Sequence, residues 1–147
     1  MTLWKLKITV DELNQRNRQN NRKTIHDSLG IQFTEIGEDF IEATMPVDGR
    51  THQPFGILHG GASVVLAESL GSIASNLVIN SPDKIAVGIE VNASHLNKAE
   101  SGFVTGRVTP IRIGRSLHVW QIQIRADSDL QSKPICHARL TVTIINR

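Results

Sequence analysis

The 147-residue sequence contains a single cysteine, Cys136, so no disulfide can form within the chain. A lone thiol fits a reducing compartment, and its alternating apolar neighbours favour a structural thiol over a nucleophile. The first residues lack the apolar run of a signal peptide and soon reach Asp11 and Glu12. No stretch approaches the about 20 apolar residues that a membrane span needs. These absences predict a soluble, cytosolic protein with one domain over residues 1–147, long enough to bury a core.

Several functional motifs are also missing. The net charge of +2 is no argument for a nucleic-acid partner, although a mild basic bias suits small anionic ligands. There is no phosphate-binding P-loop, dinucleotide fingerprint or H-E-x-x-H pair, and the histidines are scattered without metal-ligand spacing. His59-Gly-Gly61 is similar to the oxyanion loop of lipases, but no G-x-S-x-G motif follows it. We therefore expect no metal site and no nucleotide cofactor.

One long helical pattern dominates what is present. The Gly-rich turn from Gln53 to His59 leads into residues that are apolar almost all round the helix as far as Asn76 and beyond. Such a helix belongs inside a protein. Its glycines and serines would weaken an isolated helix, because a glycine costs about 1 kcal/mol relative to alanine. Packing must therefore stabilise it, and the run Asn80-Ser-Pro-Asp83 marks its end.

Glu68 lies in the middle of this apolar helix. A carboxylate taken out of water is either paired or functional, because an unpaired buried charge is costly. Ser72 lies four residues later on the same helical face, which makes the two residues a candidate site. At the helix start, Gly60 and Gly61 leave backbone amides unpaired where negative charge is favoured, as a tetrahedral oxyanion requires. The alternative is that Glu68 has a buried partner and the glycines serve only close packing.

Two short helices and six strands are predicted around this helix. Thr9 and Glu12 have the spacing of a capping box for a helix over Thr9–Gln19, and Thr24–Leu29 adds a helical turn. The strands are expected over Ile31–Ile36, Phe40–Val47, Ile85–Leu96, Gly102–Ile113, Leu117–Ala126 and Ile135–Ile145, the last four as a meander joined by hairpins. Their alternation indicates an antiparallel sheet with one face on a core, an α+β fold in which a curved sheet wraps the helix.

The third of these strands carries a candidate residue. Its odd positions are apolar from Ile85 to Ala93, and His95 shares their parity. Strand alternation therefore aims His95 at the helix side of the sheet, as a hydrogen-bonded core residue or as part of a site. The loop before the helix brings His52, Gln53 and His59 to the helix start.

The pattern of Gln53, His59-Gly60-Gly61, Glu68 and Ser72 resembles the hotdog-fold acyl-coenzyme A thioesterases of the phenylacetate-pathway type. The strings Glu42-Ala-Thr-Met-Pro-Val47 and Asn92-Ala-Ser-His-Leu96 are most similar to bacterial 1,4-dihydroxy-2-naphthoyl-CoA hydrolases of menaquinone synthesis and their enterobactin-pathway relatives. The likeness covers nearly the whole chain. It implies a homotetramer built as a dimer of dimers, each dimer sharing a continuous sheet and holding its active sites at the subunit interface, with acyl-CoA thioesters as substrates and no cofactor.

The same resemblance implies a role for each site residue. Glu68 is the nucleophile or general base, and Gly60 donates its backbone amide to the thioester oxygen. Gln53 and His59 line the reacting centre. The other implied contacts are Ser72 and His95, which support the base and the thioester end, and Arg115, which contacts a phosphate of coenzyme A.

Helical geometry adds an independent argument about assembly. His59 and Glu68 are nine positions apart, which places them on opposite sides of a helix and about 13 Å apart. If both act on one substrate, His59 of one subunit must meet Glu68 of another. A thiolate leaves readily, so an activated nucleophile and oxyanion stabilisation suffice. Two classes of function stay open: a thioesterase, acting on acyl-CoA or on misacylated carrier proteins, and a non-catalytic acyl-CoA-binding protein.

Overall fold

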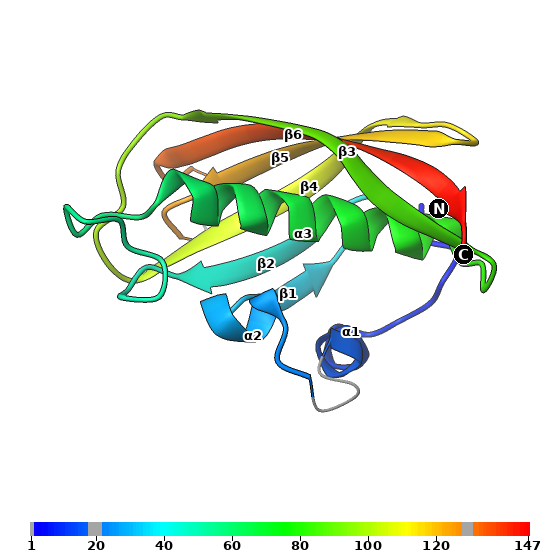
Figure 1. The fold of residues 1–147 in the computed structure, drawn as a ribbon, viewed down its shortest axis with the longest axis horizontal. Helices are drawn as coiled ribbons and strands as arrows, with labels where there is room; N and C mark the ends of the chain where they lie inside the picture. The colour runs from blue at the N-terminus through cyan, green and yellow to red at the C-terminus, as the bar shows by residue number, and fades with distance from the viewer. Residues whose placement is uncertain (1, 18–21, 128–130) are drawn as a thin grey trace.

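The computed structural model describes residues 2–17, 22–127 and 131–147. The helices are α1 (Val10–Asn17), α2 (Ile25–Leu29) and α3 (Gly60–Ile79), and the strands are β1 (Gln32–Ile36), β2 (Ile41–Pro46), β3 (Lys84–His95), β4 (Phe103–Ile113), β5 (Leu117–Arg125) and β6 (Pro134–Asn146). A six-stranded antiparallel sheet with the order β1-β2-β4-β5-β6-β3 curves around α3 (Figure 1). This is the α+β arrangement that the sequence predicts.

The central helix α3 begins and ends where its sequence signals lie. Asn80 ends it in the left-handed conformation, with φ of 41°, and donates its backbone N–H to Asn76 O. Leu66, Leu70 and Ala74 on the sheet side are fully buried. Gly71 allows a close approach to β6, because a Cβ there would lie 2.5 Å from Leu140 Cδ2. Packing therefore holds this glycine-containing helix in place.

By length and composition α3 could cross a membrane, which corrects the expectation that no stretch is long and apolar enough. Its most apolar window is 61% buried inside the protein. The core helix of a folded domain has the same composition, because it too is apolar nearly all round.

The core joins the N-terminal segment, the sheet and α3. The inward side chains of β5 and β6 are those predicted by alternation, and Trp120, Ile122, Ile124, Cys136, Ala138, Leu140 and Val142 are all buried. Trp120 Nε1 donates to Ser75 Oγ of α3 at 2.7 Å, and the Trp4 ring stacks on Trp120 with centroids 6.3 Å apart. Burial raises the pKa of the Cys136 thiol, which fits a structural role for it.

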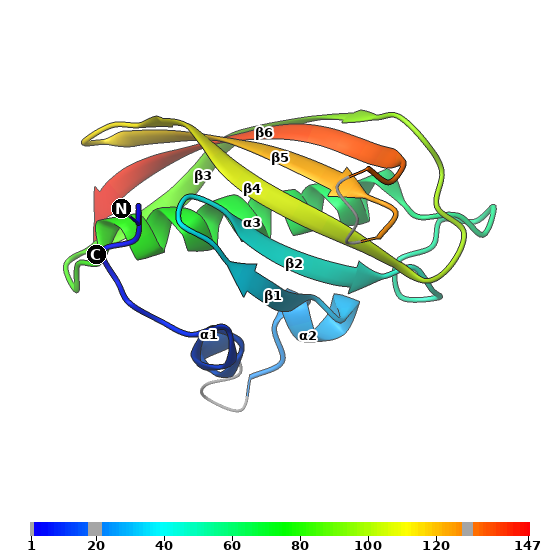
Figure 2. The same ribbon diagram turned by 180° about the vertical axis from the view of Figure 1, so that it is seen from behind.

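The two short helices lie beside β1, as both views show (Figures 1 and 2). The capping box of α1 is confirmed, since Thr9 N–H donates to Glu12 Oε2 at 2.8 Å and Glu12 N–H donates to Thr9 Oγ1 at 3.2 Å. The predicted end of this helix at Gln19 lies outside the described residues. Asn14 exchanges two hydrogen bonds with the backbone of Phe33, so α1 covers the β1 edge of the sheet.

The predicted meander of the last four strands is wrong for β3. It pairs with β6, not with β4, while β4 pairs with β2 and β5. The reason is the path of residues 96–102, which cross the end of α3: Leu96 N–H donates to Ile135 O, Leu58 N–H to Ala99 O, and Val47 N–H to Gly102 O. Three strand spacings of about 4.8 Å separate β3 from β4, which this segment easily spans.

The predicted parity of β3 is also wrong in its first half. A register shift between Gly88 and Glu90 inserts an extra residue, so Val87 and Ile89 are exposed while Gly88 faces α3. A bulge of this kind turns the following side chains over. After it, Val91 and Ala93 pack on the core, as the odd positions were expected to do.

Candidate functional site

The N-terminus of α3 is the polar centre of the predicted site. His59 is its N-cap, and its Nδ1 accepts a hydrogen bond from Gly61 N–H at 2.8 Å. This bond corrects the expectation that both glycine amides are unpaired. Because Nδ1 accepts, the neutral ring carries its proton on Nε2. Among the described residues the N–H of Gly60 has no partner, so it is available to an incoming oxygen.

His95 lies directly over Gly60. A Cβ on Gly60 would stand 2.7 Å from His95 Nε2, so a side chain at this position would have to displace the ring. The β6 register sets this placement, since His95 pairs with Cys136. His95 is exposed and makes no hydrogen bond that the described part of the chain contributes, so the alternative of a core histidine is wrong.

A pocket of about 370 Å³ opens at this point. Gln53, Gly60 and His95 line it together with Ser63 and Lys98, so the structure brings three of the seven predicted site residues into one cavity. Gln53 is held within its own loop: its Oε1 accepts from Phe55 N–H, and its backbone N–H donates to Ile57 O. The side-chain nitrogen of Gln53 remains to donate to a ligand.

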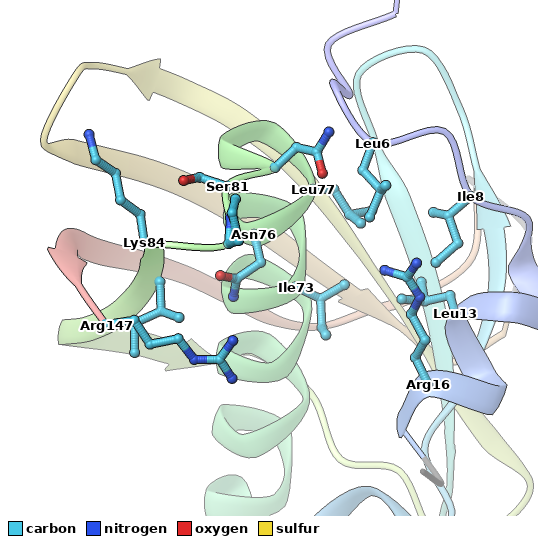
Figure 3. A pocket seen from close by; sticks show the side chains of 13 residues that line it. Leu6, Ile8, Leu13, Arg16, Ile73, Asn76, Leu77, Ser81, Lys84 and Arg147 are labelled. Atoms are coloured by element: carbon cyan, nitrogen blue, oxygen red, sulfur yellow. The ribbon is translucent and has the colours of Figure 1, made fainter.

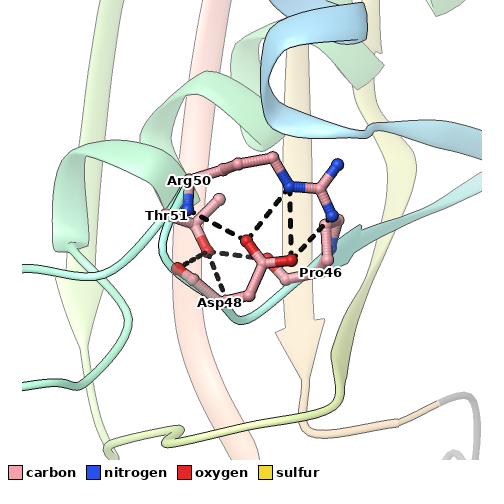
Figure 4. A network of polar contacts seen from close by, with 4 residues as sticks. All are labelled: Pro46, Asp48, Arg50 and Thr51. Carbon is pink, nitrogen blue, oxygen red and sulfur yellow. Dashed lines mark hydrogen bonds and ion pairs between the residues drawn. The ribbon is translucent and has the colours of Figure 1, made fainter.

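The loop before α3 is ordered by a compact polar network (Figure 4). Arg50 Nη2 lies 2.7 Å from Asp48 Oδ2, and Thr51 Oγ1 donates to Pro46 O at 2.7 Å. Hydrogen bonds from the Arg50 side chain and backbone lower the pKa of Asp48 to about 2. His59 N–H donates to Thr51 O, which ties the helix cap to this loop.

Glu68 does not lie where the sequence predicts. It is exposed in the single chain, which corrects the expectation of a buried carboxylate, and it has no hydrogen-bond or ion-pair partner in the described ranges. The alternative of a buried partner is therefore wrong. Its Oε1 lies against Gly88 of β3, where a Cβ would be only 2.5 Å away. The sequence analysis missed Gly88, although a glycine inside a strand is itself a signal for close approach.

The predicted residues are distributed over three places in one chain. His59 is turned away from the 370 Å³ pocket and lines another with His52, Ala62 and Val65. Glu68 and Ser72 follow along the partly open side of α3. Arg115, in the β4–β5 hairpin, lines a pocket with Val78 and Ile79 at the far end of α3, about 30 Å of helix from Gly60.

No group of three His, Cys, Asp or Glu side chains within the described ranges could hold a metal ion.

Comparison with known proteins decides the family. The pattern of the thioesterase superfamily matches residues 55–133. The chain belongs to this superfamily. It is 47% identical to the 1,4-dihydroxy-2-naphthoyl-CoA hydrolase of Escherichia coli K12, over 97% of this chain and 99% of that protein. It is 42% identical to the proofreading thioesterase EntH of Cronobacter turicensis, over 97% of this chain and 98% of that protein.

A solved structure gives the same answer for the fold. The crystal structure of a thioesterase from Haemophilus influenzae matches with a TM-score of 0.88 and 49% identity, over 99% of this chain and 96% of that one. The hotdog fold and the resemblance stated from the sequence are thereby confirmed, and this thioesterase is a thioester hydrolase.

Proposed function

We propose that this thioesterase hydrolyses aromatic acyl-CoA thioesters, with 1,4-dihydroxy-2-naphthoyl-CoA as the first candidate substrate. The observation that carries the proposal is the Gly60 N–H at the start of a 20-residue helix, which no described residue pairs, inside a pocket lined by Gln53 and His95. The 47% identical hydrolase of E. coli supports the substrate. The positive end of the helix dipole and a free amide stabilise the oxyanion that forms when the thioester carbon is attacked.

Glu68 is the proposed nucleophile or general base. As a nucleophile its carboxylate attacks the thioester carbon, expels the thiolate and leaves an anhydride that water cleaves. As a base it takes a proton from the water that attacks. A single turnover in ¹⁸O-labelled water identifies the nucleophilic route when water cleaves the anhydride at the Glu68 carbonyl, because the label then enters the Glu68 carboxylate. The general-base route places the label in the product acid and never in Glu68.

The site is proposed to form between subunits. Glu68 lies nine positions beyond His59 on a regular helix, so one chain does not bring the two together. The β1 edge of the sheet is covered by α1, but β3 is the other edge strand and carries the exposed Val87 and Ile89. Strand β3 has 12 residues, and within the described residues no second strand pairs with its outer edge; this edge, next to the Glu68 side of α3, suits pairing with a second copy. A homotetramer of two such dimers is the proposed assembly.

Arg115 is proposed to contact a phosphate of coenzyme A. The pocket that it lines also contains Lys5 and Lys84, and none of the lining residues that the structure describes is Asp or Glu. Because this pocket is at the opposite end of α3 from Gly60, we propose that Arg115 serves a site of another subunit.

The test measures thiol release from benzoyl-, dihydroxynaphthoyl- and palmitoyl-CoA by the parent, Glu68→Gln and, as a matched control, Glu35→Gln on the exposed side of β1. Glu68→Gln should lower kcat by about 10² to 10⁴, and Glu35→Gln should retain activity. More than a tenth of parental turnover in Glu68→Gln would remove Glu68 from the central role. A higher kcat/KM for palmitoyl-CoA than for benzoyl-CoA would overturn the aromatic preference.

Proofreading of misacylated carrier proteins is the second candidate function. The 42% identity to a proofreading thioesterase favours it. Equal acyl groups presented on coenzyme A and on a carrier protein distinguish the two, since a proofreading enzyme should have the higher kcat/KM for the carrier protein. A third possibility, acyl-CoA binding without hydrolysis, would show saturable binding and no thiol release.

A further inference from the structure

Another pocket, of about 590 Å³, lies between α1 and the C-terminal half of α3. Leu6, Ile8 and Leu13 form one wall, and Ile73, Leu77 and Ile85 form the opposite side. The volume falls within the about 300–1,000 Å³ typical of small-molecule sites. None of Gln53, Gly60 and His95 contributes to it.

The rim of this pocket is cationic. Arg16 lies on one side and Lys84 and Arg147 on the other, with Ile73 and Asn76 of α3 between them (Figure 3). Among the described residues that line it there is no Asp or Glu. Within the described ranges none of the three cations forms an ion pair shorter than 4.0 Å. Arg16 interacts electrostatically with Glu12, but that carboxylate already accepts hydrogen bonds from Thr9.

The floor of the pocket is held by backbone contacts. Asn76 donates from Nδ2 to Ser72 O at 2.8 Å and accepts from Ala86 N–H at 3.1 Å, which fixes α3 against β3. Lys5 and Leu6 N–H both donate to Leu77 O, so the N-terminal wall is attached to the last turns of α3. The apolar walls are thus held in place without a ligand.

We propose that this pocket binds amphipathic carboxylates, molecules with an apolar body and one anionic end. The apolar walls take the body, and a guanidinium of the rim, Arg16 on one side or Arg147 on the other, takes the carboxylate. Guanidinium groups suit this ligand because they offer paired donors to a carboxylate. The site lies beyond the reacting centre: Gly60 and Asn76 are 16 positions apart on α3, or about 24 Å. The ligand is either a free acid or the carboxylate-ended acyl group of a thioester.

Binding is tested with decanoate on the full chain, followed through methyl NMR signals. Decanoate should shift the methyl signals of Leu6, Ile8 and Leu13 in a saturable manner and leave those of Ile57 and Ile135, in the smaller pocket, unchanged. Decanol, which has the same body without the charge, should bind at least tenfold more weakly. The double variant Arg16→Gln/Arg147→Gln should lose at least tenfold in decanoate affinity. The control is Arg139→Gln, which removes an exposed cation of β6 outside this pocket and should leave the affinity unchanged.

The two sources of carboxylate are separated by activity. If the acyl group is the source, its carboxylate-ended chain must span the about 24 Å from Gly60. The ratio of kcat/KM for icosanedioyl-CoA to that for icosanoyl-CoA should then fall about tenfold in the double variant. If a free acid is the source, that ratio stays constant while decanoate binding is lost. The proposal is overturned if decanoate leaves the Leu6, Ile8 and Leu13 signals unchanged, or if it binds the double variant as well as the parent. Because binding is measured without hydrolysis, its failure does not bear on the proposed thioesterase site.

Discussion

Replacing Gly88 by alanine separates the placement of Glu68 from the stability of the fold. Gly88 is in β3 and faces α3 at the point where the Glu68 carboxylate lies. Its φ is outside the left-handed region, so alanine adopts the same backbone without strain. The added methyl group therefore acts on the carboxylate and not on the strand.

The size of the effect follows from one distance. The new Cβ would lie 2.5 Å from Glu68 Oε1, whereas ordinary contacts begin at 3.4 Å, so the carboxylate must move by 0.9 Å. A misplacement of about 1 Å at a reacting group costs about 10²-fold in rate. Folding should not suffer, because the atom displaced is the end of a flexible side chain and alanine in a strand is more favourable than glycine by about 0.5–1 kcal/mol.

The assay compares kcat/KM for benzoyl-CoA and the thermal midpoint of Gly88→Ala with those of the parent. We expect kcat/KM to fall about 10²-fold and Tm to stay within about 4 °C. Gly49→Ala is the matched control, since a Cβ on Gly49 meets nothing within 4 Å. If Gly88→Ala keeps activity within twofold of the parent, the position of Glu68 against Gly88 is not the one that acts in catalysis.

Three further predictions concern assembly, pH and the core. His59→Ala and Glu68→Gln, unfolded and refolded together, should recover near a quarter of parental activity, because random pairing gives about half mixed dimers with one intact site of two; verified mixed oligomers no more active than their parents would exclude a shared site. Burial lowers the pKa of His118 and of His26 below the ordinary 6.5, so the unfolded chain binds more protons just below pH 6.5. The free energy of unfolding should therefore fall as the pH drops below 6.5, and these two histidines should not change it above pH 6.5. Urea titrations in which the free energy of unfolding of His118→Gln falls as much as that of the parent would contradict this. Ser75→Ala leaves the buried Trp120 N–H without its acceptor and should lower the free energy of unfolding by about 1–3 kcal/mol. The control Ser101→Ala, at an exposed position, should lose no stability, and equal urea midpoints for the two variants would refute the prediction.

Local patterns in the sequence were enough to find the elements. The central helix is predicted by the apolar residues on nearly all sides of Gly60–Ile79, and Asn80 marks its end. The alternation in β5 and β6 predicts the buried side chains around Trp120. The capping box of Thr9 is a pattern of the same local kind. Helical and strand periodicity depend on neighbours within a few residues, which the sequence displays directly.

The resemblance to thioesterases also rested on short strings of residues. Such strings are informative because the spacing of His59, Gly60 and Glu68 in the sequence fixes their relative positions along one helix. The structure added that Gly60 N–H has no partner in the described part of the chain, while Gly61 N–H donates to His59 Nδ1. A cap of this kind depends on the side-chain torsion of one residue, which spacing does not give.

Only the tertiary structure decided the neighbours of β3 and the surroundings of Glu68. The pairing of β3 with β6 depends on the path of residues 96–102 across the end of α3, and the bulge at Gly88 reverses the parity that alternation predicted. Glu68 was expected to be buried because its helix is apolar, but the helix has one open side and Glu68 lies there, against Gly88. The physical reason is that periodicity shows which residues share one face of a helix or strand. Burial depends instead on which distant segment covers that face, and contacts between residues far apart in the chain decide which segment it is.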